Sequence, residues 1–531
     1  MDLLTSCIRA DGEYAQLLAA VRAAFRDKPL PLLANGLCEG ATEAFMTSLI
    51  EDVCTKAAPD GGVSRTGRRR CALIVCPEEK DCVRLRQTLE RFGLRAAFYT
   101  PRDLSFYNVT ASHEYEHERM RVLSGLAAGT LDAVITTPDA ALSYTVPPDV
   151  LRAASVRLDF HTPVDPGTLA ERLVAAGYNR VDIVEGAGQF AVRGGIIDVF
   201  APFGTYIDDE GELRAGSYPL RVELFGDEID RMGLFDPETQ RMTCAVDEAE
   251  LLPSREVLTD AAGLERLAAA IAAQRKSARS DEARRTLAEE AAAVTAARAE
   301  QTPTGAGLHF LDRYIRLVYP EPACLLDYFP ERTLFLIRSN AAVQDRLRGG
   351  EKLLNEQVVS LCESGLLAGK YAEFARPAAA FERFLESNVT VHVDSLSYGM
   401  SGRRLGGIFG FRTRHMVSYA DNLRLLCEDV TRYREGGYRI AVIAENETAA
   451  RSLADLFADA GIPAAIPAPG SADTPDAMPR GTVLIHWRSY LFGYELMVPR
   501  IAILSTNPDS RTGSRSWTWC PSTSGRTRTT A

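Results

Sequence analysis

The sequence predicts an α/β protein in which an α+β, strand-rich module interrupts a parallel α/β domain and a small α/β domain follows. Three observations lead to this prediction. Apolar runs alternate with helix-like segments up to about residue 154, a rhythm typical of a parallel sheet covered by helices. Runs rich in β-branched and aromatic residues cluster between residues 155 and 242, as strands require. Helix-like and strand-like segments alternate again after residue 395.

The composition indicates a globular protein of several domains. The chain has 531 residues, of which 46% are hydrophobic and 25% charged, and these are ordinary values. A net charge of −11 argues against a basic nucleic-acid-binding face over the chain as a whole. The 11 cysteines lack the paired spacing of zinc ligands, so we expect free thiols in a reducing cytoplasm. The sequence shows neither a signal peptide nor a run long enough to span a membrane, so we expect a cytoplasmic protein without membrane contact.

The first domain begins with a regular alternation of segments. Three runs read as buried strands, namely PLLANG, RRCALIVCP and LDAVITT. The segments before and between them have helical spacing, as in EYAQLLAAVRAAF, ATEAFMTSLIEDVCTKA and DCVRLRQTLERFG. This order predicts a parallel sheet with helices on both faces.

The turn after the first strand, NGLCEGAT, lies where a nucleotide-binding fold carries its phosphate loop. In the pattern GxxxxGK[ST], glycines let backbone N–H groups cradle phosphates and the lysine offsets their charge. Here Asn35 replaces the first glycine and precedes Gly36, Gly40 is in place, Ala41 replaces the lysine, and Thr42 is in place. We therefore expect a degenerate P-loop-type domain that binds no cofactor and does not hydrolyse ATP.

The segment HEYEH invites a metal hypothesis. His113 and His117 stand at the spacing of a zinc metalloprotease helix. No third ligand can be located in the sequence, and Ser112 reads as the N-cap of a helix. We expect a charged, solvated helix face, with a metalloenzyme as the less favoured alternative.

The stretch around residues 177–241 has the strongest strand character. QFAVRGGIIDVF and YPLRVELF predict two strands, joined as a hairpin by the polar, turn-rich GTYIDDEGELRAGS. Gly194 and Gly195 within the first run predict a bulge or a close backbone approach. Two arginines and an aromatic residue on these strands are typical of a protein-binding surface.

Three ordered motifs, VRGGIIDVF, PLRVELFGDEID and LFDPETQR, resemble the UvrB-homology module of the bacterial transcription-repair coupling factors (Mfd), and more distantly the excision-repair protein UvrB. The resemblance covers residues 1–505 and is strongest over residues 153–253. It implies a module that docks onto UvrA, with Arg193, Arg221 and Phe225 at the positions that the family uses for this contact. The alternative is that Phe225 belongs to the core and that Arg221 pairs with a carboxylate on its own hairpin, either Glu223 or Asp227.

A second sign of degeneracy lies in LLDYFPERTLFLIRSNA. In UvrB-like relatives this strand ends in acidic residues that position Mg²⁺ and water. The residues from Thr333 to Ala341 include no carboxylate, and Arg338 stands where acids are expected. Both losses argue against the alternative of an active UvrB-like ATPase or helicase that loads onto damaged DNA.

The remaining chain completes the expected organisation. An Ala-rich segment after the module predicts one or two long helices, and the last residues are rich in Ser, Thr and Arg without periodicity. We expect the first part of the degenerate domain at 1–154, the UvrA-docking module at 155–242, the second part with its helical connector at 243–375, a small α/β spacer domain at 376–507, and an aberrant or disordered tail at 508–531.

The resemblance implies an N-terminal fragment of a coupling factor. Such a fragment is expected to be a non-catalytic adaptor that recruits UvrA to stalled transcription complexes in transcription-coupled nucleotide excision repair. ATP and Mg²⁺ are expected only for the translocase motor domains, which this sequence lacks. RNA polymerase and double-stranded DNA are expected to bind only through those absent C-terminal domains.

Overall fold

The chain forms two compact units. A computed structural model describes residues 3–27, 29–55, 70–102, 114–300, 308–329, 332–394, 404–467, 478–487 and 493–507. The larger unit holds Gly12–Leu37 and Phe45–Phe411, and the smaller unit holds Met1–Asp11, Cys38–Ala44 and the chain from Arg412 onward. The predicted tail, 508–531, and His113 lie outside the described residues.

A seven-stranded sheet is the base of the larger unit, and all of its neighbouring strands are parallel. Two of the inner strands, ALIV and AVIT, are nearly continuous apolar runs and are fully buried, as strands covered on both faces are. The predicted parallel α/β domain is thus confirmed. In spatial order the strands are β16 (Gly407–Gly410), β1 (Leu32–Asn35), β15 (Val389–Asp394), β14 (Leu334–Arg338), β2 (Ala72–Val75), β4 (Ala133–Thr136) and β3 (Ala96–Tyr99).

Helices that precede the inserted module and helices that follow it contribute residues to one hydrophobic core with strands of this sheet. Strand β5 (Tyr144–Thr145), before the module, pairs with β13 (Ala323–Cys324), after it. The module therefore interrupts a single domain. The helices that come before the module in the sequence are α2 (Gly12–Ala24), α3 (Glu39–Cys54), α4 (Glu79–Arg91), α5 (Glu114–Ala128), α6 (Pro138–Leu142) and α7 (Pro148–Ala154), and those that come after it include α11 (Ile315–Val318), α12 (Asn340–Ser364) and α13 (Ala378–Ser387).

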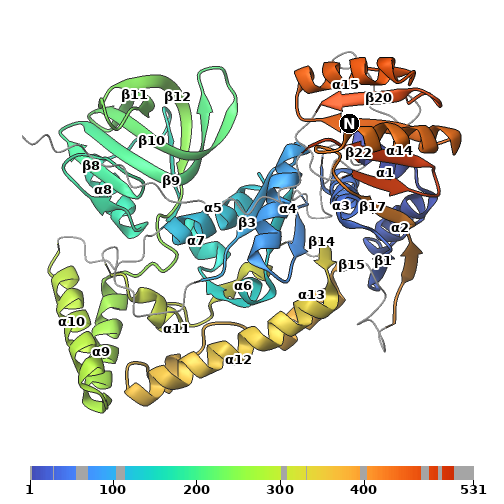
Figure 1. Ribbon diagram of the computed structural model, residues 1–531. Helices are drawn as coiled ribbons and strands as arrows, with labels where there is room; N and C mark the ends of the chain where they lie inside the picture. The colour runs from blue at the N-terminus through green and yellow to red at the C-terminus, as the bar shows by residue number, and fades with distance from the viewer. Residues whose placement is uncertain are drawn as a thin grey trace, which may run out of the picture. The chain divides into compact units, whose positions relative to one another are not determined.

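The strand module is a second, mostly antiparallel sheet in the order β6-β12-β11-β10-β9-β8-β7. Because β12 also pairs with β9, four of its strands close into a ring around an apolar interior. Figure 1 shows this curved sheet with α8 beside it. The elements are β6 (Val156–Asp159), α8 (Pro166–Ala175), β7 (Asn179–Arg180), β8 (Gln189–Arg193), β9 (Ile196–Asp208), β10 (Leu213–Phe225), β11 (Glu228–Phe235) and β12 (Met242–Leu251).

The hairpin differs from its prediction in two respects. Gly194 and Gly195 form the turn between β8 and β9 rather than a bulge within one strand. A close backbone approach is present at Gly195, where a Cβ would lie 2.8 Å from the Leu224 carbonyl oxygen, but not at Gly194. Most of the predicted polar connection is strand, because β9 and β10 stay paired as far as Ile207 and Leu213.

Two domain boundaries also lie elsewhere than expected. The module continues past residue 242, because β12 pairs with β11, β9 and β6. The first α/β domain continues past residue 375, because β15 and β16 both pair with β1 in its sheet. Strand pairing with distant segments decides both ends, and no local sequence signal marks them.

A buried ionic cluster fixes the end of the strand module to α5. Glu256 follows β12, and its carboxylate accepts hydrogen bonds from Arg119 at 2.8 and 3.0 Å. Arg102 lies 2.8 Å from the same carboxylate. Glu116 on α5 completes the link by accepting the Glu256 backbone N–H at 2.8 Å and pairing with Arg255 at 3.3 Å. The module is therefore joined to its host domain by charges held out of water.

This cluster makes stability depend on pH. Burial alone would raise the pKa of Glu256, but Arg102 and Arg119 outweigh burial and lower it to about 2 from its usual 4.5. A lowered folded-state pKa stabilises the protein above the unfolded value, and this contribution is lost as pH falls toward the folded value. We expect the difference in thermal midpoint between wild type and Glu256→Gln to be full above about pH 4.5 and to shrink toward about pH 2. A difference independent of pH would contradict this.

The Ala-rich connector forms two helices, α9 (Ala261–Ser277) and α10 (Asp281–Arg298). Asp260 caps α9 and Ser280 caps α10, each through a side-chain oxygen that accepts a backbone N–H. Their apolar stripes join the core of the α/β domain. Figure 1 shows the two helices side by side as a hairpin.

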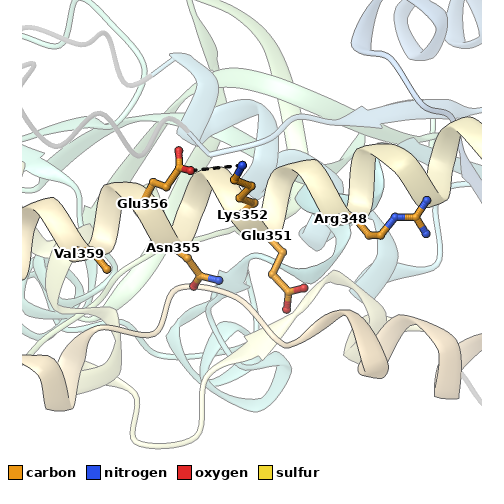
Figure 2. Close-up of a pocket in the computed structure, with 6 residues that line it drawn as sticks. All are labelled: Arg348, Glu351, Lys352, Asn355, Glu356 and Val359. Carbon is orange, nitrogen blue, oxygen red and sulfur yellow. Dashed lines mark ion pairs between the residues drawn. The ribbon is translucent and has the colours of Figure 1, made fainter.

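The long helix α12 carries a hollow of about 500 Å³ along one side. Figure 2 shows that its lining comes from this one helix, with an ion pair between Lys352 and Glu356 at 3.9 Å. A hollow formed by a single exposed helix does not enclose a ligand, since ligand sites bury most of what they bind. We assign no site to it. Its lining residues are Arg348, Glu351, Lys352, Asn355, Glu356 and Val359.

The smaller unit has its own six-stranded sheet in the order β17-β21-β22-β18-β20-β19, with a separate core under α14 and α15. Among the described residues of either unit, no helix is both long and apolar enough to cross a membrane. The elements are α1 (Leu3–Arg9), β17 (Thr413–Met416), α14 (Leu423–Glu435), β18 (Arg439–Ala444), α15 (Glu447–Asp459), β19 (Ala464–Ala465), β20 (Val483–Trp487), β21 (Gly493–Leu496) and β22 (Ile501–Ser505).

Candidate functional site

The two arginines singled out in the strand module meet at one carboxylate. Asp198 on β9 is fully buried and stands directly opposite Arg221 on β10. Arg221 binds it through two nitrogens, at 2.6 and 2.9 Å, and Arg193 at the end of β8 pairs with it as well. A buried carboxylate needs such partners, because an isolated charge is costly away from water.

Arg221 is further held by two contacts on the same face. It donates a hydrogen bond to the Gln240 carbonyl oxygen at 2.8 Å, and its guanidinium lies 5.1 Å from the centre of the Phe235 ring. Gln240 is itself fixed, since its side-chain amide donates to the Val184 carbonyl at 3.2 Å. With 12% of its side chain exposed, Arg221 is largely a structural residue of this face.

Phe225, unlike Arg221, is highly exposed to solvent. It ends β10, and 82% of it is exposed, which is unusual for a large aromatic side chain. The Leu224 N–H donates to the Gly195 carbonyl at 2.7 Å, so the end of β10 lies against the turn that follows Arg193. Phe225 therefore follows a residue that is bonded to the turn after Arg193, and we refer to Arg193, Arg221 and Phe225 together as the Phe225 face.

The contacts resolve the alternatives that the sequence left open. Phe225 is not a core residue, and Arg221 pairs with Asp198 rather than with Glu223 or Asp227. The sequence reasoning missed Asp198 and Gln240. Asp198 had a signal, since it is the one carboxylate within the apolar run IIDVF. Gln240 had none.

The two arginines should differ when removed. Arg221→Ala leaves buried Asp198 with fewer partners and should cost about 2–3 kcal/mol of stability. Arg193 is 42% exposed, so Arg193→Ala should cost about 1 kcal/mol or less. Chemical denaturation of the two variants checks this order, and equal losses would contradict it.

The turn that the sequence predicts to be a degenerate phosphate loop is arranged as follows. Gly36 adopts a left-handed φ of 76°. Ala41, at the lysine position, is fully buried. The Thr42 hydroxyl, which would bind Mg²⁺ in an active loop, donates to the Cys38 carbonyl at 3.0 Å. Burial raises the pKa of the Cys38 thiol, which keeps it uncharged. These side chains do not fit the β- and γ-phosphates of a nucleotide or its metal.

The second degenerate segment lies at the carboxyl end of β14. Arg338 ends this strand, and Asn340 begins α12. The neighbouring strand β15 ends in Asp394, whose Oδ1 accepts the Asn340 N–H at 3.1 Å. Burial raises the pKa of Asp394 to about 6. The sequence reasoning missed this carboxylate, although a lone acid at the end of the buried run VTVHVD could have revealed it.

Residues 114–117 of the HEYEH segment begin α5. Glu116 in its middle is buried and bound to Arg255 and to the backbone of Glu256. His113 lies outside the described residues. Among the residues that the structure does describe, no group of three or more His, Cys, Asp or Glu side chains is placed to hold a metal ion.

Comparison with known proteins identifies the class of the module. Residues 156–256 match the UvrB interaction domain, in agreement with the span from β6 to the buried Glu256. Over up to 75% of its length, the chain is similar to transcription-repair-coupling factors. The *Bacillus subtilis* protein is 25% identical over 410 residues, or 74% of this chain. The *Myxococcus xanthus* protein is 37% identical over 142 residues, or 27% of this chain.

The similarity covers only part of these relatives. The aligned region is 32% of the *Bacillus subtilis* protein and 11% of the *Myxococcus xanthus* protein. A protein of *Staphylococcus epidermidis*, 22% identical over 75% of this chain, is likewise covered over 32% of its length. The chain therefore spans less than a third of the relatives that it matches.

Proposed function

We propose that this chain acts in transcription-coupled nucleotide excision repair by recruiting UvrA through the Phe225 face. The observation that carries the proposal is the exposure of Phe225 on the UvrB interaction domain, at the end of the strand that also carries Arg221. Interface hot spots are enriched in aromatic and arginine residues surrounded by well-ordered neighbours. The relatives' name, transcription-repair-coupling factor, supports the pathway.

The three residues have different parts in the proposed contact. Phe225 enters an apolar pocket of the partner, since its ring has almost no contact with its own domain to lose. Arg193, with 42% of its side chain exposed, offers charge-assisted hydrogen bonds to a partner carboxylate. Arg221 holds Asp198 and thereby orients Arg193. The partner surface that fits is an apolar pocket with an acidic rim.

The proposal includes that the chain is an adaptor and does not turn over ATP. The buried Ala41 and the engaged Thr42 hydroxyl support it, because a triphosphate needs a cation and a free metal ligand at these positions. Translocation on double-stranded DNA and contact with RNA polymerase are assigned to regions of the relatives outside the matched third. No metal or nucleotide is proposed as a cofactor of this chain.

Capture of purified UvrA on the immobilised chain tests the proposal. Wild type should retain UvrA, and the triple variant Arg193→Ala, Arg221→Ala, Phe225→Ala should not. Failure of the wild-type chain to bind, or equal binding by the triple variant, overturns the docking proposal. ATP hydrolysis by the purified wild-type chain overturns the adaptor proposal separately.

A further inference from the structure

We propose that the chain fills its own former phosphate loop, with the Thr413 hydroxyl taking the place of a phosphate oxygen. The inference rests on the proposed lack of ATP turnover and deepens it, because it names what occupies the loop. Loss of the lysine is then only part of the reason that nucleotide is excluded. The rest is a replacement ligand supplied by the protein.

The first contact lies within the smaller unit. Thr413 begins β17, and its Oγ1 accepts a hydrogen bond from the Cys38 backbone N–H at 2.7 Å. In an active loop, N–H groups of this stretch point at phosphate oxygens. Cys38 is partly buried, so its backbone N–H is best satisfied by an acceptor, and a hydroxyl oxygen can accept an N–H at this distance. Thr413 meets this requirement without any anion.

The second contact lies within the larger unit and is independent of the first. A Cβ on Gly36 would lie 2.1 Å from the Phe411 carbonyl oxygen, so the backbone of Phe411 covers this glycine closely. The Phe411 N–H also donates to the Asn35 carbonyl at 2.9 Å. The strand before it, β16, holds this arrangement by pairing Gly410 with Asn35. The absence of a side chain at Gly36 thus leaves room for the backbone of Phe411, where in an active loop it would leave room for a phosphate.

Because of these two contacts, restoring the residues of the phosphate-loop pattern should not restore nucleotide binding. Asn35→Gly with Ala41→Lys turns the loop into GGLCEGKT, which satisfies the full phosphate-loop pattern. If only side chains were missing, this variant would bind nucleotide. With Phe411 and Thr413 in place, it should not.

The first test measures binding of MgATP, with a fluorescent ATP analogue as probe, to wild type and to the Asn35→Gly, Ala41→Lys variant. Circular dichroism confirms that the variant is folded. We expect binding by neither protein. Micromolar binding by the restored variant alone overturns the filled loop and leaves the adaptor proposal intact. Binding by wild type overturns both.

A second test reads the Thr413 contact directly and does not depend on the folding of a lysine variant. Hydrogen–deuterium exchange of the Cys38 amide should accelerate roughly tenfold in Thr413→Ala, since one hydrogen bond is lost. Thr413→Ser keeps the hydroxyl and should retain protection. The Tyr419 amide, which is bonded to the Ser505 carbonyl, serves as an internal control. Unchanged exchange at Cys38 in Thr413→Ala overturns the proposal.

Discussion

Glu256→Ala is expected to lower the free energy of unfolding of the larger unit by about 3–5 kcal/mol. Glu256 is the shared partner of Arg102 and Arg119, and both guanidinium groups are almost completely buried. Without the carboxylate, Arg119 loses its bidentate partner and Arg102 keeps Asp312 at 3.4 Å. Buried charges that lose a partner cost far more than an exposed pair gains. Urea denaturation followed by far-ultraviolet circular dichroism measures the loss.

An exposed ion pair of the same unit is the matched control. Glu356 pairs with Lys352 on α12 at 3.9 Å, and both side chains are largely solvated. Glu356→Ala should change the free energy of unfolding by less than about 0.5 kcal/mol. If the two alanine variants are equally stable, the buried cluster does not hold the strand module to its host domain.

Phe225→Ala is expected to weaken UvrA binding by about 30-fold or more, the effect of losing a hot-spot side chain worth about 2 kcal/mol. Its own domain should keep its stability, because 82% of Phe225 is exposed and truncation leaves no cavity. Binding is measured by surface plasmon resonance with purified UvrA, and stability by thermal unfolding of the same samples.

The same strand offers a matched control for this variant. Leu213 begins β10 and is 62% exposed, whereas Phe225 ends the strand. Leu213→Ala removes a comparable apolar side chain at the other end of β10 and should leave UvrA affinity unchanged. Equal losses of affinity in the two variants would mean that nonspecific hydrophobic contact, and not the Phe225 face, retains UvrA.

The parallel domain could be predicted because the local sequence of several of its strands is enough to identify them. Runs such as RRCALIVCP and LDAVITT have apolar centres, CALIVC and AVI, as burial on both faces favours. The long β9–β10 hairpin could not be predicted in full. Gly204 and Gly216 read as turn residues, yet they stand opposite each other in the ladder. A Cβ on Gly204 would lie 2.3 Å from the Glu250 carbonyl oxygen, so the absence of a side chain at Gly204 lets β12 pair closely with β9. Local sequence patterns do not reveal this long-range contact.

The same distinction applies to the site. Arg193, Arg221 and Phe225 could be chosen from the motifs, but their unequal exposure depends on register. Asp198 becomes the shared partner only because it stands opposite Arg221 when β9 and β10 pair. For the former phosphate loop, the missing lysine is visible in the sequence. The occupant is not, since Thr413 comes from a strand far along the chain.

The strand module begins and ends at the same place. Val156, the first residue of β6, pairs with Leu251, the last residue of β12, so the two ends are separated by about 5 Å, the spacing of neighbouring strands. A segment with this geometry can enter a surface connection of a host protein without forcing the host's flanking elements apart. Such a module can be inserted into different host domains. The docking face proposed for it could then be carried by host domains with or without nucleotide chemistry.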